Sequence, residues 1–225
     1  MGYRRTEMAP GEWYHCYTRG IDKRTTFENR SDYERFQESL YLSNSDINIE
    51  RGRIQNLAHK EILEVERGNP LVAVGAYCLM PNHFHLLLKE IKDSGIAKFM
   101  QKVGTSYTMY FNTKRKRTGS LFVGPFRSRH IVDDRYLSRL VPYIHLNPVE
   151  LFEPGWKDGI VKNMQKLEEK IYEYPYSSLL DYKKATRNEK RIIDPRELAE
   201  LLKEKMPPLK KLLPEMHAYY QDLNF

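Results

Sequence analysis

Two histidines separated by a single residue, His83 and His85, are the side chains in this sequence whose spacing most directly suggests chemistry. They come after an apolar, partly β-branched run at 71–79 and a break at Pro81-Asn82, and they open a second apolar run. This pattern predicts two strands joined by a tight turn. Side chains alternate between the two faces of a strand, so both imidazoles should project from the same face. Such a pair can bind a divalent metal ion, although an ordinary half-exposed strand can also carry two histidines.

A second pair, Tyr143 and Asn147, is spaced four residues apart in a segment with helical periodicity. Residues at this spacing share one helix face. A tyrosine offers a phenol nucleophile, and the oxygen of an asparagine can be a third ligand for a hard metal ion. On spacing alone, however, Tyr143 could be a core residue and Asn147 a helix stop. Tyr136 is a competing nucleophile on roughly the same face, whereas His145 lies on another face and is expected to pack.

Basic residues are concentrated in one part of the chain. The net charge is +7, and the stretch 94–130 contains eight Lys or Arg and no Asp or Glu, so the rest of the chain sums to −1. One basic segment in an otherwise neutral protein favours a polyanion partner, the alternative being a solvated helix end. Interleaved aromatic residues favour nucleic acid, since bases stack on aromatic rings. The candidate DNA-binding residues are Lys102, Lys114, Arg115, Lys116, Arg117, Arg127 and Arg129.

Length and composition set broad limits. A chain of 225 residues can form one good-sized domain, or one domain with an appendage. Its two cysteines, Cys16 and Cys78, exclude a disulfide framework and fit a reducing compartment. The sequence has neither an apolar signal segment nor an apolar run long enough to span a membrane. We therefore expect a soluble, cytoplasmic protein with no membrane partner.

The order of predicted elements indicates the fold that positions these residues. It is strand, helix, strand, strand, helix, strand, which suits an α+β class: a ferredoxin-like antiparallel sheet with helices on one face. A further helix carries Tyr143, and Pro142 should kink or divide it. Ser31 with Glu34, and Ser94, are the predicted caps of the two helices of the layer. The predicted strands are 12–18, 71–79, the run from 84, 121–123 and 126–132, and the predicted helices are 32–42, 94–113 and 133–146.

Two parts of the chain lie outside this layer. The polar segment 46–69 is an insertion with a weaker helix predicted at 55–66. Beyond residue 153 we expect a helical C-terminal extension, with a helix near 162–172 and a final helix that opens at Asp194. The prolines of the tail should divide it into short helices. They are Pro207, Pro208 and Pro214.

Two motifs carry a resemblance to a known family. They are Tyr77-Cys78-Leu79-Met80-Pro81-Asn82-His83-Phe84-His85-Leu86-Leu87 and Tyr143-Ile144-His145-Leu146-Asn147-Pro148-Val149. Together they resemble the single-tyrosine HUH transposases, and within that group the REP-associated tyrosine transposases, relatives of the insertion-sequence transposases that move single-stranded DNA. The segments 119–122 and 126–128 are also similar, although Phe126-Arg127 reverses the family's Arg-Phe order, and 174–178 resembles a Trp-Ser-Ser segment. The resemblance covers roughly residues 10–182.

The resemblance implies a division of the chain and a mechanism. Residues 1–153 would be the catalytic domain and 154–225 a C-terminal extension. His83, His85 and Asn147 would bind Mg²⁺ or Mn²⁺, and Tyr143 would attack hairpin-containing single-stranded DNA to give a 5′-phosphotyrosine and a free 3′-OH. A bound cation would polarise the scissile phosphate. Whether tyrosine and histidines meet in one chain or between two chains of a homodimer stays open.

Two other functions are compatible with parts of the sequence. One is a DNA-binding protein that keeps the fold without cleaving DNA. The other is a zinc-dependent hydrolase, which would need a third His, Asp or Glu ligand and a carboxylate base. Asp133 and Asp134 are the only nearby acidic residues for that role.

Overall fold

A four-stranded antiparallel sheet is the centre of the molecule. The computed structural model describes residues 8–182, 186–194, 196 and 208–223. The strands lie in the order β2-β3-β1-β4, which is the order of a ferredoxin-like layer and confirms the predicted α+β class. Every neighbouring pair is antiparallel. The strands are β1 (Trp13–Arg19), β2 (Val72–Met80), β3 (His83–Glu90) and β4 (Arg127–His130).

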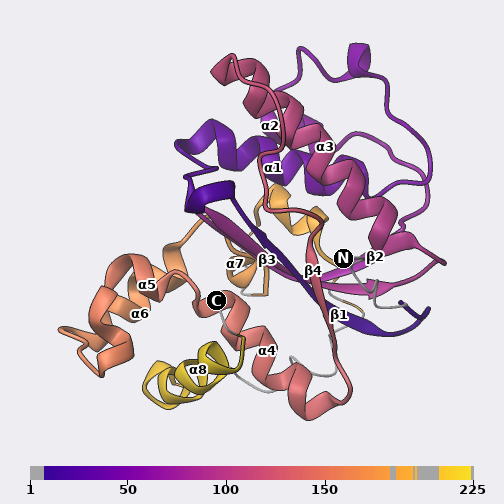
Figure 1. Cartoon of the computed structure of the whole chain (residues 1–225). Helices are drawn as coiled ribbons and strands as arrows, with labels where there is room; N and C mark the ends of the chain where they lie inside the picture. Colours follow the sequence, from indigo (N-terminus) through magenta and orange to yellow (C-terminus); the bar gives the residue numbers. More distant parts are fainter. Residues whose placement is uncertain (1–7, 183–185, 195, 197–207, 224–225) are drawn as a thin grey trace.

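Helices cover both faces of this sheet. As predicted, α1 (Arg30–Ser43) and α3 (Gly95–Arg115) lie together on one face, and α4 (Asp134–Leu146) crosses the opposite face (Figure 1). A large aromatic and aliphatic core fills the space under α1 and α3. A smaller core lies under α4, around Met80, Leu87, Leu140 and Ile144. All nine residues of β2 are buried because both of its faces are covered.

The remaining helices are short, apart from α6 and α8. In chain order they are η1 (Ile21–Lys23), η2 (Arg51–Arg53), α2 (His59–Ile62), α5 (Val149–Phe152), η3 (Pro154–Asp158), α6 (Met164–Glu173), α7 (Leu179–Tyr182), η4 (Asn188–Ile192) and α8 (Leu209–Leu223). No helix of the described residues is long and apolar enough to cross a membrane.

The helix starts differ from the predicted caps. The side chain of Asn29 caps α1 by accepting from the Asp32 backbone N–H, so the predicted box of Ser31 and Glu34 is wrong. Ser94 does precede α3, but the carboxylate of Glu90 accepts the first N–H groups of this helix, at 2.8 and 3.0 Å. The 3.0 Å bond comes from the N–H of Gly95, where a Cβ would lie 2.3 Å from the Leu71 carbonyl oxygen. A side chain at this position would therefore push α3 away from the start of β2.

Several predicted elements are shorter in the structure. The predicted strand 121–123 is reduced to one bridge between Gly20 and Phe122, because Gly119 and Gly124, both at positive φ, turn the chain on either side. The strand 126–132 is limited to β4. The helix predicted at 55–66 is the single turn α2, which buries only Ile62. The helix that carries Tyr143 is not divided, since α4 continues through Pro142.

The C-terminal part packs against strand β2 and against α4. The segment 174–178 runs beside β2, where the Leu79 N–H donates to the Tyr176 carbonyl and the Ser178 N–H to the Tyr77 carbonyl. α6 and α8 form a third apolar cluster with the end of α4. α8 runs through Pro214, so the prediction of only short helices in the tail is wrong. The helix predicted from Asp194 falls largely outside the described residues. The boundary at residue 153 stays a prediction.

Candidate active site

The pairing of the strands determines which side chains share a face with the two histidines. His83 is opposite Arg19 of β1, and His85 is opposite Tyr17. On the other edge of β1, Tyr17 is opposite Arg127. Directly paired residues project to the same side of a sheet. The face that α4 crosses therefore carries the histidine pair together with cationic side chains from β1 and β4.

α4 brings the predicted nucleophile onto this face. The ring of Tyr143 lies 5.4 Å from that of His85 and 5.9 Å from that of His15, edge-on to both. The rings of His83 and His85 are 5.2 Å apart and nearly perpendicular. All four side chains are buried, and Tyr143 is only 1% exposed. A tyrosine and two histidines almost 60 residues apart in the chain are thus neighbours within one molecule.

Asn147 completes the group. It follows α4 by one residue and is 1% exposed. Its Nδ2 donates to the Tyr143 carbonyl at 2.8 Å, and its side chain hydrogen-bonds to His83. The structure therefore brings together all four residues that the sequence singled out for metal binding and catalysis.

Burial keeps both histidines neutral. Burial and the nearby charge of Arg19 lower the pKa of His83 to about 4, against the opposing effect of the hydrogen bond with Asn147. Burial also holds the pKa of His85 well below the usual value. Nδ1 of His83 lies 2.6 Å from Oδ1 of Asn82, whose own Nδ2 donates to the Lys23 carbonyl. This orientation makes Nδ1 of His83 the donor and leaves the lone pair on Nε2.

His15 is a member of the site that sequence reasoning missed. It is completely buried on β1, and its Nε2 lies 2.9 Å from Nδ1 of His85. The two rings are stacked at 5.1 Å. Burial, with a smaller contribution from Arg129, lowers the pKa of His15 to about 3. The alternation of side chains along β1 places His15 on the same face as Tyr17. The sequence does not indicate that this face lies beside His83 and His85.

Other predicted neighbours lie around this group. Tyr136, the competing nucleophile, lies under the guanidinium of Arg129, whose Cζ is 5.1 Å from the ring centroid. His145 is buried and shares a hydrogen bond with the Ser178 hydroxyl at 2.8 Å, as its predicted packing role requires. Asp133 caps α4 by accepting from the Tyr136 N–H. That use of Asp133 disfavours the zinc hydrolase alternative.

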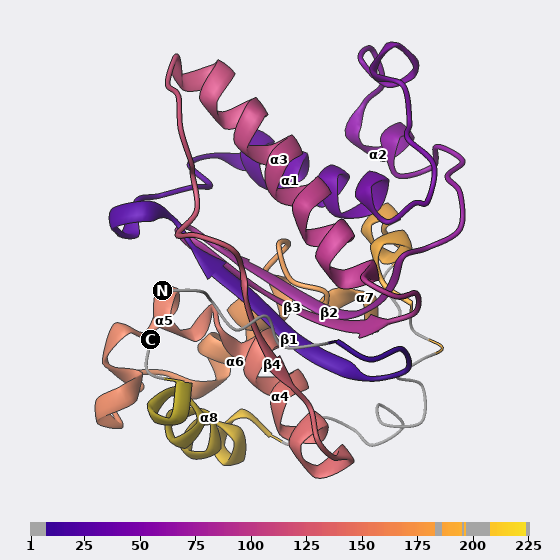
Figure 2. The ribbon, with the colours of Figure 1, turned by 45° about the vertical axis from the view of Figure 1, so that its right-hand side comes forward.

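The predicted basic residues divide between the two sides of the sheet. Arg127 and Arg129 are exposed on β4, on the face of the histidines. The others belong to α3 and its C-terminal end, on the opposite side (Figure 2). Four of them are engaged within the chain. These contacts are Lys102 with the Ser45 carbonyl, Lys114 with Asp32 and Arg115 with Glu28; Arg117 also donates to Asn112 and to the Ser120 carbonyl.

Comparisons with known proteins identify the family. A family model described as "Transposase IS200 like" matches residues 13–147, from the first strand to Asn147. The chain belongs to this IS200-like transposase family. No curated protein matches. A solved structure titled "Structure of the REP associates tyrosine transposase bound to a REP hairpin" is similar over 80% of this chain and 84% of that chain, with a TM-score of 0.51 and 15% identity. At this identity the similarity shows a shared fold.

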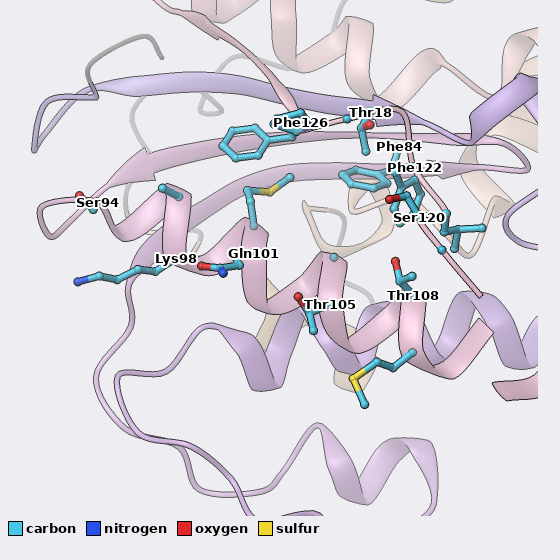
Figure 3. Close-up of a pocket in the computed structure, with 18 residues that line it drawn as sticks. Thr18, Phe84, Ser94, Lys98, Gln101, Thr105, Thr108, Ser120, Phe122 and Phe126 are labelled. Atoms are coloured by element: carbon cyan, nitrogen blue, oxygen red, sulfur yellow. The ribbon is translucent and has the colours of Figure 1, made fainter. Parts of the chain in front are cut away.

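This transposase-family chain also has a groove on the other face of its sheet. It has a volume of about 830 Å³ and lies between α3 and the loop 119–126 (Figure 3). Gln101, Thr105 and Thr108 line it from α3, and Phe122 and Phe126 lie across from them. None of the described residues that line it is acidic. Aromatic and hydrogen-bonding side chains in such a groove suit the bases of a single strand.

The donor set on the α4 face fits a divalent cation. Two neutral imidazoles and one amide oxygen can coordinate Mn²⁺, and Mg²⁺ less readily, because imidazole favours the softer of these ions. The orientation of His83, with its proton on Nδ1, puts the lone pair on Nε2, the nitrogen that would bind the cation. Among the described residues there is no cluster of three or more His, Cys, Asp or Glu side chains that could hold a metal ion. Any site here would therefore depend on Asn147.

Proposed function

We propose that this transposase-family protein cleaves and rejoins single-stranded, hairpin-containing DNA through a covalent bond to Tyr143. The observation that supports this most is the meeting of Tyr143, His83, His85 and Asn147 on one face of the sheet. The His85 ring lies 5.4 Å from the Tyr143 ring and 5.2 Å from the His83 ring. Membership of the IS200-like transposase family supports DNA as the substrate. The related fold bound to a REP hairpin favours a hairpin-containing strand.

The chemical step is a transesterification. The phenolic oxygen of Tyr143 forms a bond to the scissile phosphorus, the bond from phosphorus to the 3′ oxygen breaks, and that oxygen leaves with a proton as a free 3′-OH. The reverse attack by a 3′-OH on the 5′-phosphotyrosine releases the tyrosine and joins two strands. The number of phosphodiester-type bonds is unchanged, so strand transfer needs no external energy source.

The other side chains have supporting roles in this proposal. His83, His85 and Asn147 would hold Mg²⁺ or Mn²⁺, which supplies a positive charge that stabilises the phosphorane-like transition state. Because both imidazoles are neutral, the ligands would leave the charge of the cation intact. Arg127 and Arg129 would bind phosphates of the strand that enters this face. Lys102, Lys114, Arg115, Lys116 and Arg117 would contact DNA that extends around α3.

A cleavage assay with end-labelled hairpin DNA and Mn²⁺ tests the proposal. We expect the wild type to form a protein–DNA adduct that survives denaturation, and Tyr143→Phe to form none because the nucleophilic oxygen is missing. Tyr136→Phe is the matched control, since it removes the same hydroxyl from the same helix and should keep the adduct. Removing the divalent cation with a chelator should abolish the adduct in both active proteins.

Two results would contradict the proposal. An adduct that persists in Tyr143→Phe and disappears in Tyr136→Phe would assign the chemistry to the other tyrosine. Salt-sensitive binding of the hairpin by the wild type, with no adduct under any metal, would favour a DNA-binding protein that does not cleave.

A further inference from the structure

The hydrogen bond between His15 and His85 decides which nitrogen of His85 can bind a metal ion. Two imidazole nitrogens at 2.9 Å share one hydrogen, so one ring donates and the other accepts. If Nδ1 of His85 donates, the lone pair of His85 is on Nε2, and this ring can bind a cation in the same way as His83. If Nε2 of His15 donates, the hydrogen of His85 is on Nε2, and no ligand atom remains on that side of the ring.

We propose that His15 is a positioning residue, which accepts the Nδ1 hydrogen of His85 and so presents Nε2 of His85 to the divalent cation. This inference rests on the proposed function, because it needs a metal site at the histidine pair. In this arrangement the two predicted histidine ligands have the same tautomer. Asn82 accepts from Nδ1 of His83, and His15 accepts from Nδ1 of His85. Metal-binding histidines usually donate their second N–H to such an acceptor, which fixes both tautomer and ring orientation.

The surroundings of His15 hold the acceptor in place. The side chain is fully buried, and its ring stacks on that of His85 with an interplanar angle of 23°. Tyr17 contacts the His15 ring from its own strand at 4.8 Å, and Tyr143 meets it edge-on. Nε2 of His15 therefore cannot turn away from His85 without repacking β1 against α4.

A packing role alone does not account for a histidine at this position. When Nε2 accepts, the hydrogen of His15 is on Nδ1, which is buried and has no hydrogen-bond partner among the described residues. An unsatisfied buried donor is unfavourable, and an apolar side chain of similar size would avoid it. The only hydrogen bond that the imidazole of His15 makes among the described residues joins it to the proposed metal ligand.

The test compares two substitutions at residue 15 in metal-binding measurements without DNA. His15→Gln places an amide oxygen near the position of Nε2 and keeps the acceptor, whereas His15→Leu removes it. Mn²⁺ affinity, measured from the EPR signal of the free ion, should fall about 10- to 100-fold in His15→Leu and stay within about threefold of the wild type in His15→Gln. His83→Ala and His85→Ala should abolish binding in the same assay.

A spectroscopic measurement on the wild type keeps the inference testable if His15→Leu does not fold. In long-range ¹H–¹⁵N spectra of histidine-labelled protein saturated with Zn²⁺, a diamagnetic ion, His85 should have its hydrogen on Nδ1. A hydrogen on Nε2 of His85 would overturn the inference, as would Mn²⁺ affinity in folded His15→Leu equal to that of the wild type. If neither His83→Ala nor His85→Ala changes Mn²⁺ binding, the proposed metal site itself fails.

Discussion

We expect Arg127 and Arg129 to contact a DNA strand that reaches Tyr143. They are exposed on the edge strand β4 and share the face of the histidine pair. Each phosphate neutralised on a single strand contributes about 0.7 to the slope of log K against log salt concentration. Replacing both arginines with alanine should therefore make this slope shallower by about 1.4 and weaken binding uniformly across sequences.

The measurement is a salt titration of binding to a hairpin with a single-stranded flank. Replacing two exposed arginines of the opposite side, Arg30 and Arg53, with alanine is the matched control, and should leave the slope nearly unchanged. Equal slopes for the wild type and the Arg127→Ala, Arg129→Ala protein would remove β4 from the DNA-binding surface and leave that role to α3.

At the scale of residues, the sequence predicted the four residues that the structure brings together, but not His15 beside them. The spacing of His83 with His85 and of Tyr143 with Asn147 is local, so periodicity places each pair on one face. The contact between His15 and His85 depends on the register of β1 against β3, 70 residues apart. Register is set by which residues pack against each other across the two strands, and the periodicity of one strand does not determine it.

Among the elements, α2 is joined to distant parts of the chain through one ionisable side chain. His59 approaches Glu38 of α1 at 3.1 Å and Glu189 of η4 at 3.5 Å, with only 17% of its side chain exposed. Burial lowers the pKa of His59, and the contacts with the carboxylates of Glu189 and Glu38 more than offset this and raise it to about 9. The imidazolium therefore binds the insertion 46–69 to α1 and to the C-terminal part.

Because the pKa of His59 is raised in the folded protein, we expect its contribution to the free energy of unfolding to depend on pH. Below pH 6.5 the histidine is protonated in both the folded and the unfolded protein, so its ion pairs contribute fully. Between pH 6.5 and about 9 only the folded protein keeps the proton, so the contribution falls as pH rises, and it is gone above pH 9. The free energy of unfolding of His59→Gln should be lower than that of the wild type by about 1–2 kcal/mol at pH 6, with the difference closing by pH 9.5.

Urea unfolding at several pH values measures this difference. Lys60→Gln, a neighbouring substitution on the exposed surface of α2, should show no change in its difference from the wild type over the same range. A difference for His59→Gln that is constant from pH 6 to 9.5 would mean that the charge of His59 does not stabilise the fold. The contact also explains why the helix predicted at 55–66 is a single turn in the structure. One turn is enough to bring His59 to the two carboxylates, and these tertiary contacts outweigh local helix propensity.

Taken as a whole, the molecule encloses its proposed nucleophile between two apolar clusters. Tyr143 is packed against the sheet, and on the side of α8 a cavity of about 210 Å³ is lined by Tyr143, Leu212 and Met216, among others. The order of the ferredoxin-like layer was predictable from strand and helix periodicity. The position of α8 over α4 was not predictable from the sequence. It depends on how residues far from the layer fold back onto α4.

A phosphodiester can reach the oxygen of Tyr143 only if this packing opens, since the side chain is 1% exposed. Leu212 and Met216 of α8 are buried beside the cavity, whereas Leu167 of α6 belongs to the same apolar cluster without lining the cavity. Truncating a buried leucine or methionine typically costs about 2–5 kcal/mol of packing. If opening limits the reaction, Leu212→Ala with Met216→Ala should raise the initial rate of adduct formation about tenfold or more, because each 1.4 kcal/mol changes a population about tenfold. Leu167→Ala should loosen the same cluster and leave the rate within about threefold of the wild type.

Hydrogen exchange of α4 and α8 would verify that the double variant opens where intended. Faster exchange in these helices with an unchanged rate of adduct formation would mean that DNA reaches Tyr143 by another route, through displacement of α4 from the sheet.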